Sequence, residues 1–147
     1  MLFKDEYDFL SNFYQAPMLW HGAFWPTVEH AFQAAKCVHP EDEEIIRACS
    51  TPGKAKVIGR SVLLRPDWEK VKVDVMTELV ILKFNPARPG HLAAALRATE
   101  TMPLEEGNYW HDNFWGNCYC DECLNKPGEN VLGIILMEVR KDLRDGN

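Results

Sequence analysis

The chain has 147 residues, which suits one domain with one hydrophobic core. Its apolar content of 46% and charged content of 26% are those of an ordinary soluble globular protein. The net charge of −6 at pH 7 argues against a protein that coats nucleic acid through bulk electrostatics, although a local basic patch can still hold one phosphorylated small molecule or nucleotide.

The sequence also indicates a cytoplasmic protein with no membrane partner. Its longest uncharged apolar stretch, residues 131–137, is far shorter than the roughly 20 residues that a membrane span needs. The N-terminus has no basic segment followed by an apolar run, so we expect no signal peptide. Five cysteines without an export signal indicate reduced thiols or metal ligands rather than disulfides.

The N-terminal segment predicts turns and strands that lead into a helix. Residues 1–25 are rich in aromatic residues and are interrupted by Asn12, Pro17 and Gly22, which indicates short extended pieces and turns rather than a helix. A helix is expected to begin after Thr27, because its hydroxyl can accept a hydrogen bond from one of the first free backbone N–H groups.

The rest of the chain predicts further helices separated by proline and glycine. Proline is common at the first position of a helix, and glycine often ends one. We expect helices that begin at Pro40, at Thr51-Pro52 (ending near Gly59), over about 68–84, over 90–98 and over about 130–144, with an irregular segment at 103–129.

Apolar residues recur at helical spacing in the two longest of these helices. No repeat or linker divides the chain, so we predict a single domain over residues 1–147. Its fold is expected to be mainly α, a compact orthogonal helical bundle with one or two short strands near the N-terminus or in a loop. The expected buried faces carry Trp68, Val71, Val75, Leu79 and Leu82, and then Val131, Ile135, Leu136, Val139 and Leu143.

The segment WPTVEHAFQAAK (25–36) is the most informative for chemistry. On a helix, Glu29, Gln33 and Lys36 share one face, and Glu29 lies in the first turn, near the positive end of the helix dipole. The alternative is a solvated polar face with an ordinary Glu–Lys pair. Nearby aromatic residues favour a functional site, because such density is unusual beside an exposed strip: Trp20, Phe24, Trp25 and His30.

Four cations, Lys54, Lys56, Arg60 and Arg65, fall within 12 residues beside a Thr-Pro-Gly helix start. Their side chains and the free N–H groups of the helix can bind phosphate. The alternative is a charged surface helix. The segment is not a Walker loop, because it lacks the longer glycine-framed loop and the Lys-Ser/Thr ending.

Aromatic residues surround Asp112 in the segment YWHDNFWG (109–116). They can hold a flat base, with the carboxylate facing a base edge or a ribose. The alternative is a set of core aromatic residues beside a surface aspartate.

Three cysteines, Cys118, Cys120 and Cys123, lie within six residues. Three thiolates can ligate zinc, but a structural zinc site usually has four ligands. Loop thiols without a metal are therefore the expected interpretation, and zinc is the alternative. The fourth ligand would have to come from His111, Cys37, Cys49 or Asp121.

Seven segments in order resemble the motif set of the NADAR (YbiA-like) family, and they cover nearly the whole chain. The resemblance implies a compact, mainly α fold and N-glycosidase activity. The substrate is either an early riboflavin-pathway ribosylamino intermediate or ADP-ribose attached to a base, such as guanine in nucleic acid. The segments are FLSNFY (9–14), WPTVEHAFQAAK (25–36), TPGKAKVIGR (51–60), LRPDWEKVKVDVM (64–76), KF (83–84), DNFWG (112–116) and NVLGIILMEVR (130–140).

Position by position, the resemblance implies that Glu29 is the active-site carboxylate, that Trp68 and Trp115 are site aromatics and that Asp112 is the aspartate of the last loop. Where many members have a glycine-rich loop after Trp-Gly, this chain has NCYCDECLNKPGEN (117–130). This departure leaves the choice of substrate open.

Hydrolysis of the bond between ribose C1′ and nitrogen builds positive charge on the sugar as the base leaves. Glu29 is expected to stabilise this cation or to take a proton from the attacking water. Asp112 is the second candidate, as the acid that protonates the leaving nitrogen. Lys36 is expected to pair with a phosphate or, alternatively, to form a Schiff base with ring-opened ribose. The reaction requires no metal or organic cofactor.

The expected substrate is a small nucleotide-like molecule, either free or part of ADP-ribosylated nucleic acid. Two other functions remain open: a non-catalytic module that binds NAD or ADP-ribose, and a zinc-stabilised interaction domain built on the three loop thiols. No pattern assigns an oligomeric state. The residues expected to bind the phosphate are Lys54, Lys56 and Arg60, and those expected to bind the base are Trp25, Trp68 and Trp115.

Overall fold

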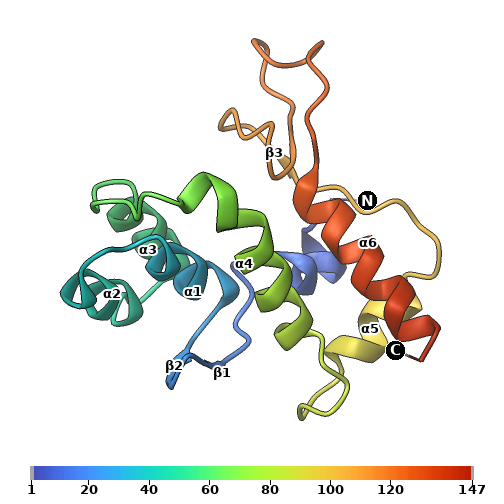
Figure 1. The fold of residues 1–147 in the computed structure, drawn as a ribbon. Helices are drawn as coiled ribbons and strands as arrows, with labels where there is room; N and C mark the ends of the chain where they lie inside the picture. Colours follow the sequence, from blue (N-terminus) through green and yellow to red (C-terminus); the bar gives the residue numbers. More distant parts are fainter. Residues whose placement is uncertain (1, 147) are drawn as a thin grey trace. The chain divides into compact units, whose positions relative to one another are not determined.

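The computed structural model describes residues 2–146. These residues form six α-helices, one 3₁₀-helix and four short strands, so the prediction of a mainly α fold is confirmed (Figure 1). Contacts between the elements divide the described chain into two compact units. One contains residues 12–83, and the other contains residues 2–11 together with 84–146.

The unit of residues 12–83 is built around helix α1, which contacts α2, α3 and α4. Figure 1 shows α1, α2 and α3 gathered beside the longer α4. A two-stranded hairpin precedes α1 in the chain. The bounds are β1 Met18–Trp20, β2 Ala23–Trp25, α1 Val28–Ala35, α2 Pro40–Arg47, α3 Pro52–Gly59 and α4 Trp68–Lys83.

The hairpin is antiparallel, and Trp20 pairs with Ala23 across a two-residue turn. Both turn residues have positive φ, +51° at His21 and +78° at Gly22. Two-residue hairpin turns of this kind match the right-handed twist of the strands, and glycine adopts positive φ without steric cost. The predicted break at Gly22 is therefore this turn.

The helix starts predicted at Thr27 and Thr51 are confirmed. Each threonine Oγ1 accepts a hydrogen bond at 3.1 Å from a backbone N–H three residues later. Pro40 and Pro52 are the first residues of their helices, and Gly59 is the last residue of α3, as predicted. Local capping chemistry therefore fixes where these helices begin and end.

The buried face of α4 differs from the predicted one. Trp68 and Leu79 are buried as expected, whereas the other three predicted residues, Val71, Val75 and Leu82, are only half-buried. The helix has apolar residues on several sides, so the sequence does not single out one buried face. The face that is buried includes Lys83, a charged residue that the prediction did not place inside. The residues buried in α4 are Trp68, Met76, Leu79, Val80 and Lys83.

The second unit consists of residues 2–11 and 84–146. Its buried residues are mostly apolar, and the rings of Phe9 and Phe84 meet edge to face with centroids 6.4 Å apart. Strands β3 and β4 pair in parallel. The bounds are 3₁₀-helix η1 Asp5–Leu10, α5 Leu92–Ala98, β3 Gly107–Asn108, β4 Asn117–Cys118 and α6 Val131–Arg144.

Two predictions for this unit are corrected. Residues 5–10, expected to be extended or turn, form a 3₁₀-helix that buries Leu10. In α6, Val131 and Leu143 are half-buried rather than inward. Arg140 is buried instead, because its guanidinium donates to Thr99 Oγ1 and to the Met102 carbonyl, both at 2.9 Å.

Candidate functional site

Glu29 lies in the first turn of α1, and its side chain is 7% exposed. The Thr27 cap fixes the start of this turn, and the Glu29 N–H donates to the Asn12 carbonyl at 3.1 Å. A carboxylate that is so little exposed is not solvated, and its place in the first turn puts it near the positive end of the helix dipole. The alternative of a solvated polar face is therefore wrong for Glu29.

Gln33 orients this carboxylate. Its amide nitrogen donates to Glu29 Oε1 at 2.9 Å across one helical turn, as the predicted shared face implied. Gln33 is 5% exposed, and a Cβ added at Gly59 would lie 2.0 Å from Gln33 Oε1. Glycine at position 59 therefore lets the end of α3 approach Gln33 closely.

His30 has a structural role. Its Nε2 donates to the Cys49 carbonyl at 2.9 Å, and its Nδ1 accepts from the Thr27 hydroxyl at 2.8 Å, as the surrounding donors and acceptors require. The ring is buried, and both of its nitrogens are used. We therefore assign His30 to the support of the α1 start rather than to chemistry.

Three cations act on one another near Glu29. Burial lowers the pKa of Lys36, the nearby charges of Arg60 and Lys56 lower it further, and the Glu29 carboxylate opposes this shift. The Lys56 ammonium also lies 5.9 Å from the centre of the Phe13 ring. The Glu29 carboxylate, Lys56 and Arg60 therefore all lie close enough to Lys36 for their charges to act on it.

Two other predicted cations point elsewhere. Lys54 lies two residues before Lys56, so the helical repeat places them on opposite sides of α3. The Lys54 ammonium donates to Ser50 Oγ at 2.9 Å. Arg65 forms two hydrogen bonds to Asp67, at 2.6 and 2.9 Å. The cations whose charges lower the pKa of Lys36 are Lys56 and Arg60, rather than Lys54 and Arg65.

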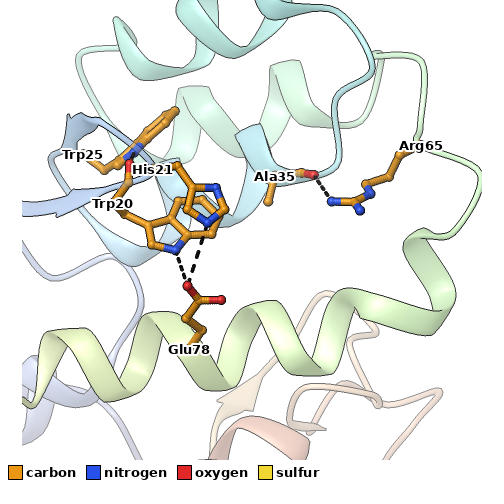
Figure 2. A network of polar contacts seen from close by, with 6 residues as sticks. All are labelled: Trp20, His21, Trp25, Ala35, Arg65 and Glu78. Atoms are coloured by element: carbon orange, nitrogen blue, oxygen red, sulfur yellow. Dashed lines mark hydrogen bonds and ion pairs between the residues drawn. The ribbon is translucent and has the colours of Figure 1, made fainter.

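Trp25 and Trp68 are both buried in the unit of residues 12–83. The Trp68 ring lies against Phe32, with centroids 5.1 Å apart. The Trp25 indole N–H donates to the Trp20 carbonyl at 3.0 Å, and the Trp20 indole donates to Glu78 at 2.9 Å (Figure 2). The assignment of both tryptophans to substrate binding stays a prediction.

A cavity of about 280 Å³ lies beside this tryptophan pair. Figure 2 shows polar contacts among residues that line it. The Trp20 indole N–H donates to the Glu78 carboxylate, and the Arg65 guanidinium donates to the Ala35 carbonyl. The His21 ring stacks on Trp20 with centroids 3.9 Å apart. The indole, guanidinium and carboxylate groups named here are all hydrogen-bonded within the protein.

Lys83 is a buried residue that the sequence analysis missed as a candidate. It is 1% exposed, and its ammonium lies 5.7 Å from the centre of the Tyr14 ring. A lysine is almost never fully buried without partners. The sequence feature that indicates this burial is the position of Lys83 at the end of α4, between the apolar residues Val80 and Phe84.

Asp112 and Trp115 lie in the other unit, in the irregular segment before α6. Asp112 Oδ1 accepts from the N–H groups of Phe114 and Trp115, at 3.1 and 2.9 Å. Both Asp112 and Trp115 are half-buried, whereas Tyr109 and Trp110 are exposed. The aromatic residues of this segment are therefore not core residues, and Asp112 shapes the turn that carries Trp115.

The three loop cysteines gather with one histidine. His111 Nδ1 and the sulfurs of Cys118, Cys120 and Cys123 all lie within 4.8 Å of one another. Of the four residues considered as a fourth ligand, the structure selects His111. Within residues 2–146, this is the one such group of histidine, cysteine and carboxylate side chains.

Among residues 2–146, no helix combines the length and the hydropathy needed to cross a membrane. The chain matches the family model of the NADAR domain over residues 2–144. The N-glycosidase YbiA of Shigella boydii serotype 4 (strain Sb227) is 39% identical over 142 residues, which cover 95% of this chain and 84% of the relative.

The chloroplastic riboflavin biosynthesis protein PYRR of Zea mays is 37% identical over 133 residues, which cover 81% of this chain and 20% of that protein. The NMR structure of the E. coli protein YbiA matches with a TM-score of 0.82 and 36% identity, over 99% of this chain and 85% of that one. Sequence and fold agree over nearly the full length. The chain therefore belongs to the NADAR family, as an enzyme that hydrolyses N-glycosyl bonds.

Proposed function

We propose that this enzyme hydrolyses the bond between ribose C1′ and nitrogen in a phosphorylated ribosylamine, with Glu29 as its catalytic carboxylate. Two substrates contain this unit: a ribosylamino-pyrimidine phosphate of riboflavin synthesis and an ADP-ribosylated base of the guanine type. The observation that carries the proposal is a buried carboxylate, oriented by Gln33, whose charge acts on Lys36 together with the charges of Lys56 and Arg60.

The reaction adds water across the C1′–N bond. As this bond breaks, its electron pair leaves with the nitrogen and positive charge develops on the sugar. The Glu29 carboxylate stabilises that charge and takes a proton from the attacking water, whose oxygen bonds to C1′. The nitrogen takes up a proton, so the products are a ribose with a free C1′ hydroxyl and the released amine or base.

The three cations hold the phosphate of the substrate. Each is a charged donor, and charge-assisted hydrogen bonds to phosphate oxygens are roughly twice as strong as neutral ones. Asp112 is the second candidate for the acid at the leaving nitrogen, and Trp25, Trp68 and Trp115 are candidates for contact with the base. We leave Lys54 out of this set, because it lies on the opposite side of α3 from Lys56.

The alternative chemistry for Lys36 is a Schiff base with ring-opened ribose. The nucleophile would be the neutral amine, and the lowered pKa of Lys36 raises the fraction of that form. Borohydride reduction during turnover tests this alternative. A covalent sugar adduct on Lys36 would establish it, and phosphate pairing predicts no adduct.

Because the family model spans residues 2–144, we treat residues 1–147 as one NADAR-like domain. We also propose a cytoplasmic location, since a reducing compartment suits the five free thiols. The partner we propose is the substrate, which is either free or attached to nucleic acid.

The test is to incubate the purified protein separately with ADP-ribosylated guanosine and with the ribosylamino-pyrimidine phosphate. Chromatography then shows whether ADP-ribose or ribose 5-phosphate is released. We expect release from one of the two, and none from either with the Glu29→Gln variant. A protein that binds ADP-ribose but releases nothing from either substrate would instead be a binding module.

A further inference from the structure

We propose that His111, Cys118, Cys120 and Cys123 bind a structural zinc ion. Their four ligand atoms lie within 4.8 Å of one another, although the residues span 13 positions of a loop. Two independent stretches of backbone meet here, since the histidine precedes β4 and two of the cysteines follow it. Nothing in the proposed hydrolysis uses these side chains.

The distances between ligand atoms fit a tetrahedral ion. Bonds of about 2.3 Å from zinc to sulfur and about 2.0–2.1 Å to nitrogen place neighbouring ligands about 3.5–3.8 Å apart. His111 Nδ1 lies 3.3 Å from the Cys120 sulfur and 3.4 Å from the Cys123 sulfur. A small movement of the side chains therefore accommodates the ion.

The surrounding backbone is arranged to support thiolates. The N–H groups of His111 and Cys120 donate to the Cys118 sulfur, at 3.3 and 3.5 Å. The Cys118 N–H is itself held by Asn113 Oδ1 at 2.9 Å. Hydrogen bonds to the ligands orient them and are common around metal sites in proteins.

The ligand set favours zinc, and a structural role for it. Thiolates with one imidazole nitrogen suit zinc, and four protein ligands leave no open position for water or substrate. The cysteines are therefore ligands and not nucleophiles. This assignment stands apart from the proposed function and does not depend on it.

The segment that the ion would hold has little core of its own. Between α5 and α6, its only regular structure in the described chain is the pair of two-residue strands β3 and β4. Side-chain amides hold its turns instead: Asn108 Oδ1, for example, accepts from the Asp112 N–H at 3.1 Å. Because His111 adjoins Asp112, zinc binding also fixes the turn that carries Trp115.

The test is the zinc content of protein purified under reducing conditions. The variants are His111→Asn and Cys120→Ser, with Cys49→Ser as the matched control. Asparagine tolerates the positive φ of +68° at position 111 but is a poor zinc ligand. Cys120 is half-buried, which makes serine a mild change. Cys49 lies outside the cluster, and its sulfur donates to the Ile45 carbonyl.

We expect one zinc ion per chain in the wild type and in Cys49→Ser, and loss of zinc from the two ligand variants after dialysis against a weak chelator. Cobalt should give the wild type the strong visible absorption of a tetrahedral thiolate site. If the variants do not fold, modification of the wild-type thiols in the presence of a zinc-sensitive dye should release the ion.

Three results would overturn the assignment. The first is wild-type protein that contains no zinc after purification and does not bind it when zinc is added. The second is a disulfide among the three cysteines under the same conditions. The third is an iron–sulfur chromophore in place of zinc. Each is distinguishable from failure of the proposed hydrolysis, because none is an activity measurement.

Discussion

The side-chain amide of Gln33 donates to Glu29 Oε1 at 2.9 Å, and both residues are almost fully buried in α1. This pair links the position of the proposed catalytic carboxylate to the packing of α3. On that helix, Gly59 lies against Gln33, and a Cβ added there would clash with Gln33 Oε1. The orientation of Glu29 therefore depends on a residue that does no chemistry.

We predict that Gly59→Ala lowers kcat by on the order of 10- to 100-fold, because it displaces Gln33 and with it Glu29. Overpacking should also lower the free energy of unfolding by about 1–3 kcal/mol. The matched control is Gly53→Ala in the same helix, where the nearest atom is an ordinary 3.9 Å away. If both variants keep wild-type kcat, Gly59 does not position the carboxylate.

Replacing both Lys56 and Arg60 with alanine should raise KM and weaken the dependence of KM on salt, with a smaller effect on kcat. Lys56 in α3 and Arg60 at the C-cap of α3 both act on Lys36, and the three cations are proposed to bind the phosphate. Lys54→Ala, on the opposite side, should change KM much less. If Lys54→Ala raised KM as much as the double variant does, a defined phosphate site at Lys56 and Arg60 would be contradicted.

The pKa of Lys36 predicts a pH dependence. Burial lowers this pKa below its ordinary value of 10.5, so the folded enzyme loses the cation at a lower pH than the unfolded chain. We expect kcat/KM to fall as the pH rises through the lowered pKa. Between that pKa and 10.5, the folded state binds fewer protons, so Lys36 makes the free energy of unfolding increase with pH.

Lys36→Arg provides the control for this prediction. Arginine keeps its charge to higher pH and still binds phosphate. Its profile of kcat/KM against pH should therefore extend further into the alkaline range than that of the wild type. An identical alkaline decline in both proteins would assign the decline to another group.

Trp115→Ala should raise KM while the melting temperature changes little, because this half-buried ring is expected to contact the base of the substrate. Isothermal titration with ADP-ribose and a thermal melt measure the two effects separately. A lower melting temperature with unchanged binding would make Trp115 a packing residue instead.

Capping chemistry made the helices predictable from the sequence. Thr27, Pro40, Thr51, Pro52 and Gly59 mark boundaries that the structure reproduces, because each acts through its own backbone or a neighbour within three residues. The buried face of α4 was not predictable in this way. Several of its sides are apolar, and only tertiary packing selects the side that carries Lys83.

The same distinction applies to the candidate sites. Glu29 and Gln33 were found on one face because the helical repeat alone relates them. Lys54 was grouped with Lys56 because proximity in sequence does not show the side of the helix. His111 was one of four possible fourth ligands, since the loop that brings it to Cys120 and Cys123 has no periodic pattern.

The most direct test of the account is kcat for Glu29→Gln on whichever ribosylamine substrate the wild type cleaves. Glutamine keeps the size of the side chain and an oxygen that can accept from Gln33, but it removes the charge. We predict a fall of at least about 100-fold in kcat, with KM and the melting temperature largely unchanged. The matched control is Glu41→Gln, an exposed carboxylate of α2, which should keep wild-type kcat. A folded Glu29→Gln enzyme with near-normal kcat would contradict both the assignment and the mechanism.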